Sequence, residues 1–208
     1  MTVHKTKKWS LIIAGAVVVG MVAVCSSLLI GLNWLWSQHR DIPLEELLID
    51  VSALPDGFDV RAGPFRPSHS DGDIVAVDSR AIIFSAGSHS NTRVGARVYL
   101  NSNKWSAAAE YRDRIEVEFN SSSVASATSW QTPSAHPYQS SVASQSHFAC
   151  HVSSIDQREV CKYFAQYDEY LVILTATPEP GILNYDDIVH LLKATDDLMA
   201  QRLSSGED

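Results

Sequence analysis

The first 40 residues of this 208-residue chain contain no aspartate or glutamate. Their only charged side chains are basic ones: Lys5, Lys7, Lys8 and Arg40. Residues 41–208 hold the other 12 basic residues and all 24 acidic ones, so their formal charge is −12. A body this acidic repels phosphate, and the charge pattern therefore argues against nucleic acid as a partner.

Charge is also absent between Lys8 and His39, where Leu11 to Leu32 form an almost wholly apolar run. As a helix, this run would be about 33 Å long, which matches a hydrocarbon core of roughly 30 Å. Tryptophans at its two ends fit the aromatic belts of the membrane interfaces. We therefore predict a transmembrane anchor over residues 9–38, which meets the lipid bilayer through residues 11–32 and has as interface anchors Trp9, Trp34 and Trp36.

Two cleaved alternatives fit the run less well. A secretory signal peptide has a shorter apolar region that ends at small residues. The stretch before Cys25 faintly resembles a lipoprotein signal, but Val24 stands where a small residue is required. The apolar run also continues to Leu32, beyond either cleavage point. An uncleaved anchor explains the whole run.

The flanks of the run predict its orientation. Three lysines lie before it, whereas Arg40 lies after it and is soon followed by Asp41, Glu45 and Glu46. The positive-inside rule places residues 1–8 in the cytoplasm as a basic tail. Residues 39–208 are then extracytoplasmic, and the protein is a single-pass protein of the cell membrane.

The outer part shows the patterns of an α+β domain over residues 58–203, after a linker over 39–57 and before a flexible tail over 204–208. Alternating or apolar stretches predict strands over 74–85, 92–100, 145–152, 159–167 and 170–177. A Gly-, Pro- and Ser-rich segment over 61–73 reads as a loop, and a Ser-rich segment over 121–146 reads as another with a short strand around Trp130.

Two amphipathic helices complete the predicted domain. Asn103 can cap a helix over 104–119, whose apolar stripe we expect to include Trp105. Asn184 and Asp187 resemble a capping box at the start of a helix over 185–203. The simplest way to bury both stripes is to pack the helices on one antiparallel sheet.

The cysteines Cys150 and Cys161 lie at equal distances from the centre of a predicted hairpin turn between Ile155 and Asp156. In that register they face each other directly, at a separation that a disulfide spans. An oxidising extracytoplasmic compartment would preserve the bond. We predict a Cys150–Cys161 disulfide, with two buried free thiols as the alternative.

The segment His147–His151 contains the metal-ligand types His, Cys and His. A c-type haem site needs a cysteine where His147 stands. On a strand, the two histidines share a face but lie about 13 Å apart, and Cys150 points the other way. We therefore expect no cofactor and no metal here, and assign the histidines to solvent or to a partner.

Sequence motifs of catalysis are scarce. The chain has no Gly-x-Ser-x-Gly elbow, no His-Glu-x-x-His and no Gly-rich phosphate loop. His89 and His136 are the loop histidines that a hydrolase could use. The pair Asp196–Asp197 on the last helix reads as a solvated face. We expect no enzymatic activity and assign no catalytic residue.

Aromatic side chains concentrate in the second half of the chain. They could be core residues, or they could form an interaction face, because Tyr and Trp are favoured at interfaces. The candidates for this interaction face are Trp130, Tyr138, Tyr163, Tyr167 and Tyr170.

The segment Leu47–Phe58 (LLIDVSALPDGF), the later Cys150…Cys161 hairpin and the closing helix resemble poorly characterised membrane-anchored bacterial proteins with a small extracytoplasmic domain. The likeness covers most of residues 47–203, and this region is similar to sensor-like and PsbP-like α+β domains. It implies a binding or accessory role and transfers no catalytic residue.

These patterns favour a non-enzymatic protein that acts through interactions, most concretely an accessory subunit of a larger membrane complex with a membrane protein as its partner. A ligand-binding or sensory domain is the second hypothesis, and it would need an apolar pocket between sheet and helices. A membrane-anchored hydrolase is the third.

Overall fold

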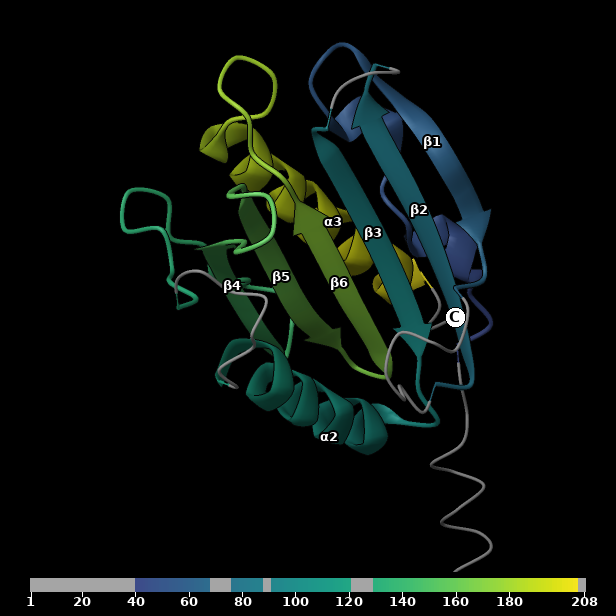
Figure 1. Ribbon diagram of the computed structural model, residues 1–208. Helices are drawn as coiled ribbons and strands as arrows, with labels where there is room; N and C mark the ends of the chain where they lie inside the picture. Colours follow the sequence, from purple (N-terminus) through teal and green to yellow (C-terminus); the bar gives the residue numbers. More distant parts are fainter. Residues whose placement is uncertain (1–39, 68–75, 88–90, 121–128, 206–208) are drawn as a thin grey trace, which may run out of the picture. The chain divides into compact units, whose positions relative to one another are not determined.

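The computed structural model describes residues 40–67, 76–87, 91–120 and 129–205. They form a six-stranded antiparallel sheet with the order β1-β2-β3-β6-β5-β4 (Figure 1). Two three-stranded meanders meet at the central β3–β6 pair. The expected α+β class is confirmed, and the strands are β1 (Phe58–Phe65), β2 (Asp78–Ala86), β3 (Arg93–Leu100), β4 (Gln145–Val152), β5 (Glu159–Tyr167) and β6 (Tyr170–Ala176).

Strand β1 is the element that the sequence patterns missed, because residues 61–73 read as a loop. Phe58 is the buried side chain of this strand, and most of the others are exposed. The strand lies at the edge of the sheet and its register shifts twice along β2. An exposed edge strand needs no apolar alternation, so the signal on which strand prediction depends is absent.

The helices cover opposite faces of the sheet (Figure 1). Helix α2 (Lys104–Ile115) continues into a π-helical turn, η3 (Glu116–Asn120), and helix α3 (Tyr185–Ser205) closes the domain. The predicted caps are confirmed: the Asn103 side chain accepts from the N–H groups of Trp105 and Ser106. Asn184 and Asp187 bond each other's backbone N–H groups at 2.9 and 3.0 Å.

The main core lies on the face of the sheet that α3 covers, here called the α3 face. Alternate residues of the central strands point into it, together with one side of α3. The other face, here called the α2 face, has a smaller core built around Tyr99, Tyr111, Phe164 and Leu171. The sheet is thus buried on both sides over β5 and β6.

Of the segment 39–57, expected as a linker, residues 40–57 belong to the folded domain. It contains two short 3₁₀ helices, η1 (Leu44–Leu47) and η2 (Val51–Ala53). Ion pairs join Glu45 to Arg80 and Glu46 to Arg202. Four apolar side chains of the segment are buried in the α3-face core: Leu44, Leu47, Leu48 and Ile49.

Trp105 does not pack on the sheet as its place in the predicted stripe implied, because 62% of it is exposed. The buried side of α2 instead carries Ala107 and Tyr111, with Ile115 partly buried beyond them. The true stripe is therefore rotated away from the tryptophan, and Tyr111 is its large buried side chain.

Among the described residues, no helix has the length and apolar character needed to cross a bilayer. The predicted span 11–32, the basic tail 1–8 and the interface tryptophans Trp9, Trp34 and Trp36 lie outside the described residues. The anchor and its orientation stay predictions.

Candidate functional site

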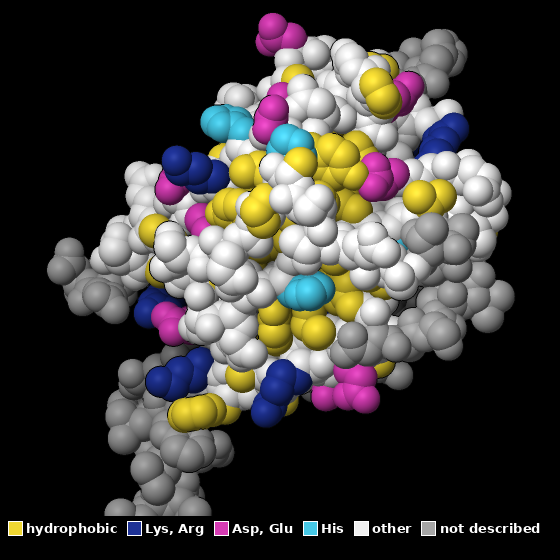
Figure 2. Space-filling view, turned by 90° about the vertical axis from the view of Figure 1, so that its left-hand side faces the viewer, with side chains coloured by type: hydrophobic (Ala, Val, Ile, Leu, Met, Phe, Trp, Pro, Cys, Tyr) yellow, Lys and Arg dark blue, Asp and Glu magenta, His cyan; other side chains and the backbone are white. Residues whose placement is uncertain are grey.

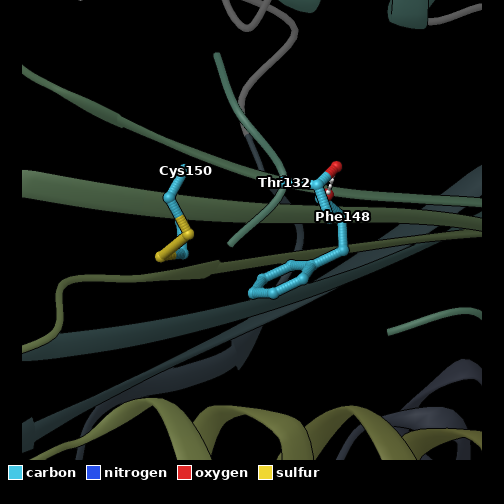
Figure 3. Close-up of a disulfide and its surroundings, with 4 residues drawn as sticks. Thr132, Phe148 and Cys150 are labelled. Carbon is cyan, nitrogen blue, oxygen red and sulfur yellow. Dashed lines mark hydrogen bonds between the residues drawn. A yellow bond between two sulfur atoms is a disulfide. The ribbon is translucent and has the colours of Figure 1, made fainter. Parts of the chain in front are cut away.

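The β4–β5 hairpin separates the residues of the His147–His151 segment onto the two faces of the sheet. Cys150 pairs directly with Cys161 in the strand register, and a disulfide joins them with their Cα atoms 4.0 Å apart. Both cysteines are buried on the α3 face. The disulfide prediction is confirmed, and Figure 3 shows the sulfur atoms and the Phe148 ring on the side of the sheet where α3 runs.

The segment 129–144 wraps around the outer edge of β4. Gln131 forms a β-bridge with Cys150, with backbone hydrogen bonds of 2.9 Å in both directions. The Thr132 hydroxyl donates to the Phe148 carbonyl at 3.2 Å (Figure 3). The expected short strand near Trp130 is therefore this bridge, and it holds Trp130 beside β4.

On the α2 face, aromatic and imidazole side chains pack together over β4 and β5 and form a group here called the β4 cluster. The Phe119 ring centroid lies 4.5 Å from that of His147, 4.8 Å from that of Trp130 and 5.3 Å from that of Phe164. The Trp130 and His151 centroids are 3.9 Å apart. Phe119 comes from the π-helical turn η3, and Trp130 comes from the segment 129–144. Strand β4 contributes His147 and His151, and β5 contributes Phe164.

A charged pair borders the β4 cluster. The Lys162 ammonium bonds the Glu118 carboxylate and lies 5.6 Å from the centroid of the Trp130 ring. Figure 2 looks onto the β4 edge of the sheet and shows histidines set among hydrophobic side chains on that side of the molecule. The cluster is only partly buried, so it presents both apolar surface and polar atoms to whatever meets it.

The histidines of the β4 cluster favour the neutral state. Burial lowers the pKa of His147 below its usual value of 6.5. The pKa of His151 is lowered too, first by desolvation and then by the nearby Lys162 charge. A neutral imidazole carries one hydrogen-bond donor and one acceptor, so each ring can bond a polar partner in either sense.

The argument against a metal or haem site at His147–His151 rests on which face of β4 each side chain occupies, and the structure shows the faces that were predicted. His147 and His151 share the α2 face, while Cys150 lies on the α3 face in its disulfide. Within the part of the chain that the structure describes, no group of three His, Cys, Asp or Glu side chains is placed to hold a metal ion.

The predicted interaction face does not exist as one surface. Tyr163, Tyr167 and Tyr170 are at most 2% exposed, and they point into the α3-face core. Trp130 belongs to the opposite face with the β4 cluster. Aromatic content alone could not distinguish core from surface here, because the strand register decides which face of the sheet each aromatic side chain occupies.

The buried tyrosines instead enclose Asp196, which the sequence placed on a solvated face. Asp196 is 4% exposed. Tyr138 donates to its Oδ2 at 2.7 Å, and Tyr163 and Tyr167 donate to its Oδ1. Burial raises the pKa of Tyr167, and the carboxylate that its hydroxyl bonds raises it further. The carboxylate therefore has phenol donors on both oxygens, and the wrapping segment is fastened to α3.

The loop histidines considered for a hydrolase occupy different situations. His89 lies outside the described residues. His136 Nδ1 lies 3.1 Å from Asp186, and its ring stacks on Tyr185 with centroids 5.3 Å apart. These contacts fasten the wrapping segment to the first turn of α3 at a second point.

A small hollow of about 150 Å³ lies where η2 meets the start of α3. Its walls mix apolar and polar side chains: Ser52, Ala53, Leu54, Pro55, Asp187 and His190. The sequence patterns did not single out this hollow, because its walls come from segments more than 130 residues apart.

Comparisons with known proteins assign this chain to no family. No family model matches the chain, and no curated protein matches it. Among solved structures, it is similar to an uncharacterised protein from Mycobacterium smegmatis, with 12% identity and a TM-score of 0.40. That match covers 75% of this chain and 98% of the mycobacterial chain.

Proposed function

We propose that this chain is a non-enzymatic single-pass membrane protein whose extracytoplasmic domain binds another membrane protein as an accessory subunit. The anchor comes from the sequence: an apolar run of bilayer length with lysines on one side. The buried disulfide supports an oxidising compartment for the domain, since such bonds are rare in reducing ones.

The observation that carries the interaction role is the β4 cluster. Trp130 and Phe119 supply partly exposed aromatic area, and the neutral histidines add hydrogen-bonding atoms without a charge to desolvate. The core of a surface that binds proteins is enriched in aromatic side chains and depleted of charged ones. Trp130 lies beside Phe119 and His151, and because it is the largest side chain of the cluster, its loss would remove most contact area.

Affinity purification in mild detergent from native membranes tests the proposal. Wild-type chain and Trp130→Ala would be compared by quantitative mass spectrometry, with Val60→Ala as the matched control. Val60 is also a large exposed apolar residue (49%), but it lies on β1 at the opposite edge of the sheet. We expect a membrane protein that co-purifies with wild type and Val60→Ala and is lost with Trp130→Ala. Recovery of the wild type only as a free monomer would refute the accessory role.

A ligand-binding or sensory domain is the second candidate, and the hollow between η2 and α3 favours it. Its volume of about 150 Å³ is below the roughly 300–1,000 Å³ of drug-sized ligand sites, so it suits a small polar molecule. A thermal-shift screen of small carboxylates and amines on wild type and His190→Ala would test it. Stabilisation of wild type alone would support this role over the accessory one.

A further inference from the structure

The first described residue of the domain, Arg40, is bound to one end of the sheet. Its guanidinium pairs with Asp168 at 3.0 Å and with Glu169 at 3.1 Å, both in the β5–β6 turn. The Tyr170 hydroxyl donates to the Arg40 carbonyl at 3.3 Å. The chain therefore enters the domain at the β5–β6 turn and not at the other end of the sheet.

The start of α2 lies at this same end (Figure 1). The Gln166 side-chain amide donates to the carbonyls of both Lys104 and Asp168, at 2.9 and 3.0 Å. The Asn101 N–H donates to the Glu169 carbonyl at 2.9 Å. These bonds join the first turn of α2 to the turn that holds Arg40.

The first turn of α2 exposes Trp105. Trp105 is 62% exposed, which is unusual for so large an apolar side chain. The Lys104 ammonium lies 5.4 Å from the centroid of its ring. A tryptophan with an adjacent lysine is the side-chain pair that suits the boundary between headgroups and hydrocarbon, where the ring and the ammonium both find favourable surroundings.

The length of chain before Arg40 limits how far this end can lie from the bilayer. Arg40 lies eight positions after Leu32, the end of the predicted span. Even fully extended, these eight steps of the chain reach at most about 29 Å. The strands run away from this end for about another 25 Å, at roughly 3.3 Å per residue. The tether joins the domain at the end that carries Trp105, so this end reaches lipid with the least extension of the tether.

We propose that the domain rests on the outer leaflet of the bilayer through this end, with Trp105 in the interfacial layer and Lys104 at the lipid phosphates. The occupant of the exposed Trp105 surface is phospholipid of the membrane that holds the chain's own anchor. The inference rests on the anchor in the proposed function and adds a second lipid contact, made by the folded domain itself.

Quenching of tryptophan fluorescence by brominated lipid tests this contact on the full chain. The protein would be reconstituted into vesicles of phosphatidylcholine and phosphatidylglycerol after Trp9, Trp34 and Trp36 are changed to Phe. Two versions each keep one tryptophan, Trp105 or Trp130, with the other changed to Phe. Trp130 is the matched control because it lies on the α2 face beside β4 at the sheet edge.

We expect brominated lipid to quench Trp105 severalfold more strongly than Trp130, with a blue-shifted emission for Trp105. Equal quenching of the two, or none of Trp105, would overturn the lipid contact. Shielding of Trp105 only when native membrane proteins are added would overturn it in favour of a protein occupant. Flotation with the vesicles after alkaline washing reports on the anchor separately. A chain that does not float refutes the proposed function. A chain that floats but has an unquenched Trp105 refutes this inference alone.

Discussion

The hydroxyl of Tyr138 donates a 2.7 Å hydrogen bond to the buried carboxylate of Asp196. Tyr138 belongs to the segment that wraps around β4, and Asp196 lies on α3, so this bond spans 58 residues of chain. A buried carboxylate is costly unless its oxygens are satisfied, and two core tyrosines complete the set of donors.

Replacing Asp196 with asparagine should destabilise the domain by about 2–4 kcal/mol, because the amide nitrogen would face phenol groups that need an acceptor. Tyr138→Phe should cost about 1.5–3 kcal/mol, the usual value of a hydrogen bond to a charged group. Urea unfolding of the detergent-solubilised full chain, followed by near-ultraviolet circular dichroism, measures both. Asp197→Asn is the control, because Asp197 is the exposed neighbour on the same helix. Equal midpoints for the Asp196 and Asp197 variants would contradict the network.

The double variant Cys150→Ser with Cys161→Ser should lose up to about 2–3 kcal/mol of stability on the loop-entropy estimate for a short closed loop. The bond pins β4 to β5 but does not take part in the β4 cluster, so binding of a partner there should persist. Thiol labelling of the denatured, non-reduced protein should modify Cys25 alone. Modification of all three cysteines would show that the bond does not form in the cell.

Tyr111 and Trp105 give a pair of opposite outcomes on one helix. Tyr111 is 7% exposed, so Tyr111→Ala should cost about 3–5 kcal/mol. Trp105→Ala should change stability by no more than about 0.5 kcal/mol, because the ring is largely outside the packed interior. Melting curves of the two variants in detergent compare them directly, and a sharp loss in the Trp105 variant would mean that α2 is rotated from its observed position.

Stability should fall when the pH drops below 6.5. The folded-state pKa values of His147 and His151 lie below 6.5, so the unfolded chain takes up protons first as the medium becomes acidic. Stability from these residues is complete above pH 6.5 and is lost as the pH falls from there toward the folded-state values. Urea midpoints at several pH values for wild type and His147→Gln measure the effect. The variant should show a shallower slope than wild type.

Protease added to intact cells or spheroplasts should digest residues 41–208 and spare the first eight residues. The lysines before the apolar run would keep the N-terminus in the cytoplasm. An epitope tag at either end, followed by blotting, reports which part is cut. Full protection of the domain would reverse the topology and would leave the disulfide without its oxidising compartment.

The sequence predicted elements where local periodicity and burial coincide. The alternation of Val94, Ala96 and Val98 marks β3 correctly, since these three residues point into the α3-face core. The symmetric spacing of Cys150 and Cys161 was enough to predict their register because a short hairpin leaves little freedom. Helix caps at Asn103 and Asn184 were equally local signals.

Features set by distant partners could not be predicted in the same way. Asp196 looks like a surface residue until Tyr138, Tyr163 and Tyr167 are brought to it from 29 to 58 residues away. The β4 cluster likewise joins Phe119 to His147 across two elements and the wrapping segment. Neither arrangement leaves a periodic trace in the chain, because each depends on which faces of the sheet the helices cover.

The bridge between Gln131 and Cys150 protects the β4 edge of the sheet from pairing with a neighbouring copy of the domain. The N–H and carbonyl of Cys150 and the carbonyl of Phe148 already have partners in the wrapping segment, so a strand from a neighbouring copy cannot pair with β4 at these positions. At the other edge, Pro64 removes a donor from β1. Crowded side by side, such domains would resist joining into a continuous sheet, and aggregation by strand addition would be suppressed at both edges.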